Sequence, residues 1–487
     1  MRRSIVLFML GLIGLLVYAA LLVRFPAGRY IAVPLANVGS ITKLSPWAAF
    51  LIACAGIMLH AAYAAAVLVC WRSQPDDRGL TVLIWGYAIA ASAMLFFIWP
   101  ITSTDLFDYI FRGHMGAYYH VSPYTVVPNR YSNDPLYRFL GWPNAPSAYG
   151  PLWELISARM AAVGGMSPWA NLLLQKAFAL LTFLLCGVVL MRMLREAGRE
   201  VQLLGGLLWL WSPLTLFEIV GMGHNDGLLV LSVLLAIWAT RHGRYHWAAV
   251  ALVIGALFKF LPLILLPFVV VYGARRRATW AARVRLALEI GLITVVLIVV
   301  CYAPYWEGTK TLANITLREK FLNAAPLAIL TYTLSQRWSI DVVRPTISMM
   351  GSAILAIGLL WQMWQIWRYD RDLRTACFGI FAWYLIIGSQ WFQPWYVLWL
   401  LAMLALQPSR ETFGWVETWA IFGQASYLLQ YFVFTRRWSG LPGNQLPAQV
   451  IYLLLIFVPP LIVWGVIRWR RRSSPPAVSQ PGHALPA

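Results

Sequence analysis

Charged residues are scarce in this 487-residue sequence. They make up 11% of it, whereas an average soluble protein contains about 25%. Hydrophobic residues make up 60%, and the mean hydropathy is +0.67. So little charge among long apolar runs excludes an ordinary water-soluble domain. The composition predicts an all-α, polytopic transmembrane helical bundle.

Cysteines are few as well, and no two of them are close in the sequence. The five are Cys54, Cys70, Cys186, Cys301 and Cys377, and all lie in or at the edges of apolar runs. Cysteines in such positions behave as small hydrophobic residues. We therefore expect neither a disulfide framework nor a cysteine-based metal site.

Acidic residues are outnumbered by basic ones, 18 Asp and Glu against 38 Lys and Arg, so the net charge is +20. Such an excess can indicate nucleic-acid binding. Here, however, most of the surplus arginine lies in short loops between apolar runs, as the positive-inside rule requires of cytoplasmic loops. We therefore expect no nucleic-acid partner, and part of the excess charge can bind phosphate-bearing membrane lipids instead.

The order of apolar runs and basic loops predicts about 12–14 crossings of a cell membrane, with both termini in the cytoplasm. We expect one transmembrane domain over residues 1–472, with a long outer loop at about 101–150, and a disordered cytoplasmic tail over 473–487. The apolar segment Pro151–Val163 is short and contains Glu154 and Arg159. These features are typical of a helix that lies at the membrane interface or re-enters it.

The apolar stretch His246–Tyr272 requires a break. Both of its flanks are rich in arginine, so both should lie on the cytoplasmic side. A single helix would put them on opposite sides. Lys259 and Pro262 near the centre instead predict two short helices that meet near the outer face, where Lys259 would line a cavity.

The outer loop begins with a charged and aromatic segment, Ser103–Tyr124. In it Asp105, Asp108 and Arg112 follow one another at spacings of three and four residues. If Thr104 caps a helix that starts there, these spacings put the three charges on one face. An acidic pair ringed by aromatic residues at a membrane surface suggests chemistry on a lipid-borne substrate. The structural alternative is a solvated loop whose carboxylates only face the helix dipole.

Three further polar clusters fall on the outer face in this topology. The first is Tyr149 in the turn Tyr149-Gly150-Pro151, the second is the turn His224-Asn225-Asp226, and the third is Gln393 with Trp395. Lys259 adds a positive charge on the same face. Ionisable groups at membrane depth are energetically costly, so they indicate function by default. Two of these clusters, and Lys259, also have a structural alternative. The turn His224-Asn225-Asp226 would be a polar turn in which Asp226 caps the next helix, and Gln393 with Trp395 would be an aromatic anchor at the membrane surface. Lys259 would form an ion pair with Glu218.

The position of these clusters suggests a substrate class. A polyprenyl-phosphate sugar keeps its lipid in the bilayer and its sugar at the surface. Transfer of the sugar needs a carboxylate to deprotonate the acceptor hydroxyl, and cations or dipoles to offset the charge on the phosphate leaving group. Asp105 fits the base, and Arg112, Lys259 and His224 are candidates for the phosphate.

Four motifs along the chain carry a family resemblance. They are T-D-L-F-D-Y-I-F-R-G at 104–113, Y-G-P-L-W at 149–153, G-H-N-D-G at 223–227 and K-F-L-P-L-I-L-L-P at 259–267. Together they resemble the GT-C superfamily of membrane glycosyltransferases, and more narrowly the bacterial polyprenyl-phosphate-mannose-dependent α-mannosyltransferases. The resemblance spans about Thr102 to Trp399.

The resemblance implies a role for each matching residue. Asp105 stands at the position of the catalytic base, and Tyr109 and Arg112 match a tyrosine and an arginine nearby. Asp108 has no clear family role, because many relatives have an arginine and a tyrosine after the base. The donor would carry a hexose, with mannose favoured, and one inverting displacement would give an α product. The lack of a large soluble C-terminal domain favours a glycan or glycolipid acceptor over a protein acceptor.

The sequence thus predicts a membrane hexosyltransferase with Asp105 as the catalytic residue. The residues expected to bind substrate are Asp108, Tyr109, Arg112, Tyr149, His224, Asn225, Asp226, Lys259, Gln393 and Trp395. We expect no cofactor, because a polyprenyl-phosphate leaving group carries less charge than a nucleotide diphosphate. The alternative is a divalent metal ion held jointly by Asp105, Asp108, His224 and Asp226.

A secondary transporter or lipid flippase is the rival interpretation. Broken helices and the intramembrane Lys259 are also typical of transporters. No two-fold repeat is visible in the sequence, however, and the charged clusters fall at one face of the membrane instead of at its midplane. The inner loops carry almost only arginine, so they offer no polar inner gate. We therefore favour a transferase.

Overall fold

The computed structural model describes residues 2–71, 78–312, 322–434 and 445–473. Within these ranges the chain forms helices joined by turns and loops, with three isolated bridges and no strand. The all-α fold predicted from the sequence is confirmed. The predicted tail at 473–487 lies outside the described residues apart from Ser473, which ends the last helix.

Seven of the described helices are long and apolar enough to cross a membrane. They are α1 (Arg2–Arg24), α4 (Pro46–Cys70), α5 (Arg78–Phe96), α8 (Pro168–Met193), α14 (Trp280–Tyr302), α17 (Ile340–Tyr369) and α21 (Leu446–Ser473). An eighth span results if α9 (Arg199–Leu210) and the segment Pro213–Gly221 cross together, with a bend of 42° between them. The chain is therefore a multi-pass membrane protein.

The predicted count of about 12–14 crossings is larger than these seven or eight, and the further predicted crossings correspond to helices that are not both long and apolar enough to count as spans. These are α11 (Asp226–Arg241), α18 (Leu373–Trp383), α19 (Val397–Leu406) and α20 (Arg410–Leu428). All 10 residues of α19 are apolar and buried, so this helix lies inside the bundle. A helix that is surrounded by protein does not have to match the thickness of the bilayer.

The predicted break in the stretch His246–Tyr272 is confirmed. The stretch folds into α12 (Tyr245–Ala256), the short 3-10 helix η5 (Leu261–Leu265) and α13 (Leu266–Arg275). The Arg277 guanidinium lies 6.0 Å from the centre of the Tyr245 ring. The start of α12 and the end of α13 therefore lie at the same end of the bundle, and Lys259 lies in the turn between the two helices.

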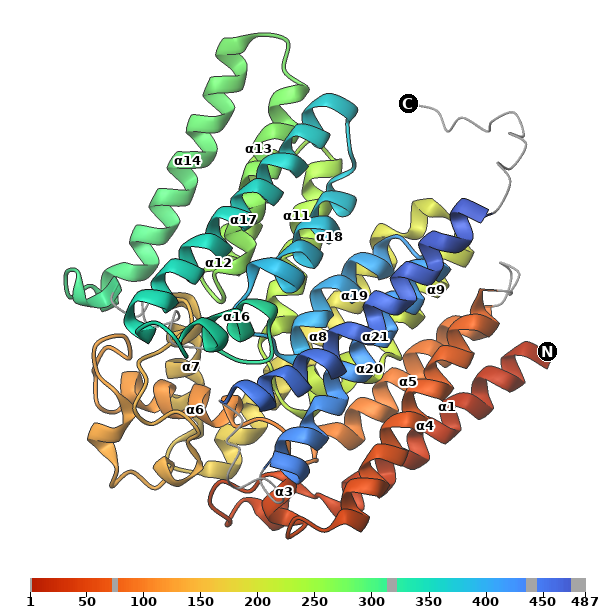
Figure 1. Cartoon of the computed structure of the whole chain (residues 1–487), viewed down its shortest axis with the longest axis vertical. Coiled ribbons are helices and arrows are strands. Elements are labelled where there is room, and N and C mark those ends of the chain that lie inside the picture. Colours follow the sequence, from red (N-terminus) through yellow and green to blue (C-terminus); the bar gives the residue numbers. More distant parts are fainter. Residues whose placement is uncertain (1, 72–77, 313–321, 435–444, 474–487) are drawn as a thin grey trace.

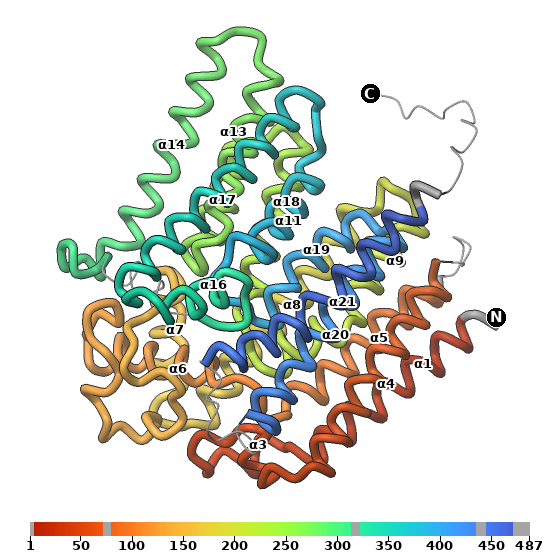
Figure 2. The backbone as a smooth tube through the Cα atoms, in the orientation of Figure 1, coloured from red at the N-terminus to blue at the C-terminus, as the bar shows by residue number. Residues whose placement is uncertain are grey.

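Two short helices, α6 (Asp105–Ala117) and α7 (Pro151–Gly164), pack against each other at one end of the bundle (Figures 1 and 2). The start of α1 and the end of α21 lie at the opposite end (Figure 1). The predicted loop at about 101–150 contains α6 and two 3-10 helices, η1 (Pro128–Tyr131) and η2 (Tyr137–Phe139). The segment that carries most of the predicted site is therefore largely structured.

Gly113 sets the distance between α6 and α7. A Cβ atom at this position would lie 2.3 Å from the carbonyl oxygen of Ser157 in α7. Two non-bonded heavy atoms cannot approach so closely without a large repulsion. Glycine is therefore required here for the two backbones to touch.

We expect Gly113→Ala to destabilise the protein by about 1–3 kcal/mol, because the added methyl group must push α6 and α7 apart. Gly86→Ala is the matched control, since Gly86 also lies within a helix, α5, and a Cβ there meets nothing within 4 Å. Thermal unfolding of the two variants in the same detergent checks this prediction. An equal unfolding midpoint for both variants would contradict it.

Candidate active site

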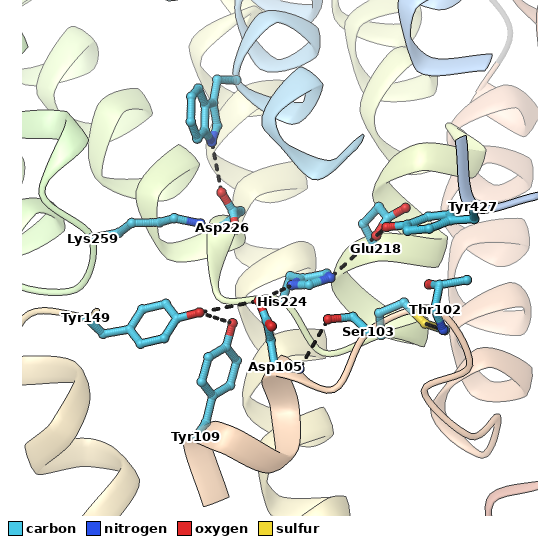
Figure 3. A network of polar contacts seen from close by, with 12 residues as sticks. Thr102, Ser103, Asp105, Tyr109, Tyr149, Glu218, His224, Asp226, Lys259 and Tyr427 are labelled. Atoms are coloured by element: carbon cyan, nitrogen blue, oxygen red, sulfur yellow. Dashed lines mark hydrogen bonds and ion pairs between the residues drawn. The ribbon is translucent and has the colours of Figure 1, made fainter. Parts of the chain in front are cut away.

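Several helix ends meet beside α6 and turn polar side chains toward one another (Figure 3). Asp105 is the first residue of α6, Asp226 is the first residue of α11, and Tyr149 lies just before α7. His224 lies in the turn before α11, and Lys259 lies in the turn after α12. Residues from four separate parts of the sequence are thus brought together, as the outer-face topology predicts.

Asp105 lies at the centre of this group. Its Oδ2 accepts a hydrogen bond from the Tyr149 hydroxyl at 3.4 Å and lies 3.9 Å from Nδ1 of His224. The side chain is 18% exposed, so a ligand can reach it. Burial raises the pKa of Asp105 above its ordinary value, and the nearby Lys259 ammonium partly offsets this rise. Asp105 therefore combines access with a raised proton affinity, as a general base requires.

The first turn of α6 is fixed by Ser103 and not by Thr104. Thr104 does stand at the predicted capping position, but its side chain makes no capping hydrogen bond. The Ser103 hydroxyl instead accepts a hydrogen bond from the Asp105 N–H at 3.2 Å. The Thr104 hydroxyl packs against Gly141, where a Cβ would lie 2.0 Å from its oxygen. The expectation that the Thr104 side chain caps the helix is therefore wrong.

Tyr109 lies behind Tyr149. The two tyrosine hydroxyls are 3.3 Å apart, and the rings meet edge to face with their centroids 4.9 Å apart. The Tyr109 ring also packs edge to face on Trp153 of α7, at 5.0 Å between centroids. Tyr109 is buried, so its contacts orient Tyr149, which makes the hydrogen bond to Asp105.

Asp108 and Arg112 are both buried and lie against the loop that follows η2. Nη2 of Arg112 lies 4.0 Å from Oδ1 of Asp108 and donates to the carbonyl oxygen of Ala145 at 3.0 Å. Burial raises the pKa of Asp108 to about 7, although the Arg112 guanidinium opposes this rise. The observed contacts of this pair hold the loop against α6. Substrate binding by either residue stays a prediction.

His224 is buried and is held from several sides. Its ring stacks on Trp395, with centroids 3.8 Å apart, which joins two of the predicted clusters. Nε2 lies 3.6 Å from Oε2 of Glu218, while Nδ1 faces Asp105. Burial lowers the pKa of His224 well below its usual value, and the Lys259 ammonium lowers it further.

Asp226 and Lys259 form an ion pair beside His224. Nζ of Lys259 donates to Oδ2 of Asp226 at 2.8 Å, and Nε1 of Trp399 donates to Oδ1 at 3.0 Å. Asp226 is fully buried, whereas the Lys259 side chain is 17% exposed. The alternative that pairs Lys259 with Glu218 is therefore wrong, because the Glu218 carboxyl group faces His224 instead.

Asn225 and Gln393 complete the predicted set. Asn225 is buried, and neither polar atom of its amide has a hydrogen-bond partner among the residues that the structure describes. Leaving such a group unpaired is costly, so Asn225 is a candidate for contact with a ligand. Gln393 lies just before the 3-10 helix η10 (Pro394–Tyr396), where its carbonyl oxygen accepts a hydrogen bond from the Tyr396 N–H at 3.0 Å.

Sequence reasoning misses Lys176. Its buried ammonium, on α8, donates to the carbonyl oxygens of Leu95, Ile98 and Gly221 at 2.9, 2.6 and 2.9 Å. These carbonyls lie where α5 ends and where the chain turns toward His224, so Lys176 satisfies groups that helix ends leave unpaired. The available signal is a lone lysine inside a long apolar run.

The residues proposed from the sequence as a joint metal site do not converge as one. Across the described parts of the chain, no three His, Cys, Asp or Glu side chains are placed to hold a metal ion. Asp226 is already bound by Lys259, and Asp108 lies beside Arg112. The expectation that the protein needs no metal remains a prediction for experiment.

The fold defines a multi-pass membrane protein, and the comparisons with known proteins are consistent with the GT-C type that the sequence motifs suggest. Residues 8–275, more than half of the chain, match the family described as alpha-(1->6)-mannopyranosyltransferase, N-terminal domain. The chain belongs to this family. It is also similar to GPI mannosyltransferase 1 of Gibberella zeae, with 34% identity over 100 residues. That match covers 19% of this chain and 24% of the relative, so it spans about a quarter of the relative's length.

Lys259→Met should destabilise the protein by about 3–5 kcal/mol, because it leaves the buried Asp226 carboxylate without its cation. Adding Asp226→Asn removes the unpaired charge, so the double variant should recover most of the lost stability. Thermal unfolding of both variants measures the difference. A double variant as unstable as Lys259→Met would show that the lysine chain stabilises the fold by packing and not by charge.

Proposed function

We propose that the protein is a membrane mannosyltransferase that moves mannose from a polyprenyl-phosphate donor to a hydroxyl of a glycan or glycolipid. The observation that carries this proposal is the partly exposed Asp105 carboxylate, which Tyr149 and His224 hold at one end of the bundle. Both the description of the family and the name of the relative support mannose as the sugar. A transporter is not favoured, because these charged groups gather at one end only.

Asp105 acts as the general base in this proposal. Its carboxylate takes the proton of the acceptor hydroxyl while that oxygen attacks C1 of the mannose. The bond between C1 and the phosphate oxygen breaks, and polyprenyl phosphate leaves with the bonding electron pair. A single displacement inverts the configuration at C1, so a β-linked donor gives an α-linked product.

Lys259 is the best-placed cation for the donor phosphate. Its ammonium is partly exposed and donates one hydrogen bond to Asp226. Its other N–H groups can therefore donate to a ligand. Arg112 is less suitable, because its guanidinium is buried against the loop at Ala145. We propose no metal cofactor, because a lysine and polar neighbours such as Asn225 can offset the single charge of a phosphodiester.

The site lies on the outer face of the membrane in this proposal. The start of α1 and the end of α21 lie at the end of the bundle opposite α6 and α7, and the arginine-rich ends of α13 and α17 also lie away from these two helices (Figure 1). At the ends of α13 and α17, Arg276 pairs with Asp370 at 2.9 Å. The positive-inside rule assigns such an end to the cytoplasm, which supports an outward-facing site.

We expect Asp105→Asn to lower the rate of mannose transfer about 10²–10⁴-fold, because an amide cannot take the hydroxyl proton. The assay uses purified protein, radiolabelled polyprenyl-phosphate mannose and a glycolipid acceptor fraction. Glu307→Gln is the matched control, since it removes an exposed carboxylate outside the site. Transfer by Asp105→Asn at the wild-type rate would exclude Asp105 as the base. No transfer by the wild type would exclude the proposed function.

The pH dependence of transfer should report the same residue. Asp105 acts as a base only when it is ionised, and burial raises its pKa. We therefore expect the rate of transfer to rise with pH, and the midpoint of this rise, the acid limb of the rate–pH profile, to lie above about 3.9, the ordinary pKa of aspartate. A rate–pH profile at saturating donor measures this limb. A constant rate from about pH 4 to about pH 8 would contradict the prediction.

A further inference from the structure

Glu218 lies directly behind His224, seen from Asp105 (Figure 3). It belongs to the π-helical segment η4 (Leu216–Gly221), and its side chain is fully buried. Its Oε1 accepts a hydrogen bond from the Gln424 amide at 3.0 Å, and its Oε2 accepts one from the Tyr427 hydroxyl at 3.1 Å. No step of the transfer described above uses this carboxyl group.

The turn after Glu218 places His224 between two carboxyl groups. Gly223 in this turn has a φ of +79°, which other residues rarely adopt, and a Cβ there would lie 2.2 Å from Leu106 of α6. The turn therefore lies directly against the helix that carries Asp105. As a result, Nδ1 of His224 is 3.9 Å from Asp105 and Nε2 is 3.6 Å from Glu218.

A second histidine fixes the orientation of the amide that contacts Glu218. Nε2 of His60 lies 3.0 Å from Oε1 of Gln424, and Nδ1 of His60 lies 2.7 Å from Oε1 of Glu417. Because His60 bonds to the oxygen of the Gln424 amide, the nitrogen of that amide faces Glu218. Oε1 of Glu218 is therefore an acceptor, and Oε2 is the oxygen that can share a proton with His224.

Each ring nitrogen of His224 faces a carboxyl oxygen, at a distance longer than a hydrogen bond, and neither nitrogen has a hydrogen-bond partner among the described residues. Two lone pairs that face each other repel, so a proton on either Nε2 or Glu218 is favoured. For the same reason, a second proton is favoured on either Nδ1 or Asp105. Asp105 carries no proton when it acts as a base, so the second proton is on Nδ1. Burial lowers the pKa of His224 well below its usual value, so the imidazole carries only one proton, and the proton between Nε2 and Glu218 belongs to Glu218.

We propose that Glu218 is a positioning residue that keeps Nδ1 of His224 protonated and so aims an N–H group at the Asp105 carboxylate. This inference rests on the proposed function, because it takes Asp105 as the base. A donor aimed at a carboxylate stabilises its ionised form. Without Glu218 the imidazole can carry its proton on Nε2 instead, and Nδ1 then presents a lone pair that favours protonated, inactive Asp105.

The test compares two substitutions of Glu218. Glu218→Met should lower kcat about 10–100-fold, as is typical when a residue that orients another is lost, and should leave the KM for the donor unchanged. It should also move the acid limb of the rate–pH profile to higher pH, because losing a donor raises the proton affinity of Asp105. Glu218→Gln should keep the limb in place, since its amide can donate to Nε2 as a protonated glutamate does.

A double variant tests whether Glu218 acts through His224. Adding Glu218→Met to His224→Ala should slow transfer no further than His224→Ala alone, because the two side chains act as one unit. The other titratable groups that face Asp105 are unchanged in these proteins. They are Asp108, Tyr109, Tyr149, Asp226, Lys259 and Tyr431.

Ser426→Ala is the control for damage to the fold. It removes a buried hydrogen bond on α20, the helix that carries Gln424 and Tyr427, without touching Glu218. It should leave the acid limb in place. If Glu218→Met slowed transfer equally at every pH and did not move the limb, Glu218 would be a merely structural residue and the proposal would be overturned.

A second measurement does not depend on transfer. In protein with isotopically labelled histidine nitrogens, NMR shifts show which ring nitrogen of His224 carries a proton, and His224→Gln assigns the signals. We expect a protonated Nδ1 in the wild type and a proton on Nε2 in Glu218→Met. An unprotonated Nδ1 in an active wild type would overturn the role of Glu218 alone. A wild type that transfers no mannose would overturn the proposed function, and the role of Glu218 with it.

Discussion

The three hydrogen bonds of the Lys176 ammonium are the interaction on which the site depends. They hold carbonyl groups where α5 ends and where η4 ends. The segment that leaves α5 leads to Asp105, and the segment that leaves η4 leads to His224. A buried cation is tolerated in an apolar bundle when it is surrounded by acceptors. Lys176 therefore fixes the starting positions of both segments, the one that carries the candidate base Asp105 and the one that carries His224.

Breaks in helices supply almost every polar group of the site. Asp105 and Asp226 stand at the first positions of helices, where a negative charge is favoured by the helix dipole. Lys259 stands in the turn of a broken helix. Irregular backbone at membrane depth is tolerated only when protein covers it, and buried helices such as α19 give that cover. The same breaks that make the site polar thus require the short, enclosed helices around it.

The sequence identified the groups whose chemistry is visible locally. Lys259 and its break follow from the charge of the flanking loops, and Asp105 and Asp226 follow from their place at helix starts beside apolar runs. The contact partners of these groups could not be predicted in this way, because partners lie far apart along the chain. Glu218 and Lys259 are both lone charges in apolar surroundings, and nothing in the sequence shows that Glu218 faces His224 while Lys259 faces Asp226.

The partners of side chains that hydrogen-bond to backbone carbonyl groups could not be predicted from the sequence either. Lys176 has carbonyl partners, which leave no mark in the residue pattern. Arg112 has the right spacing for a site residue, but it bonds to the carbonyl oxygen of Ala145. The number of membrane-spanning helices could not be predicted either, because hydropathy does not show which apolar segments are enclosed by protein. The general architecture was therefore predictable, and the pairing of its buried charges was not.

The hairpin of α12 and α13 also determines how deep its charge lies. α12 has 12 residues, and a helix rises about 1.5 Å per residue, so it reaches about 18 Å from the end where it begins. The hydrocarbon core of a bilayer is about 30 Å thick, so Lys259 can stand beyond the midplane although the hairpin returns to its starting side. One residue inserted into α12 would move the ammonium by about 1.5 Å and turn it by about 100° around the helix axis. The length of this helix is thus as much a part of the site as the lysine that follows it.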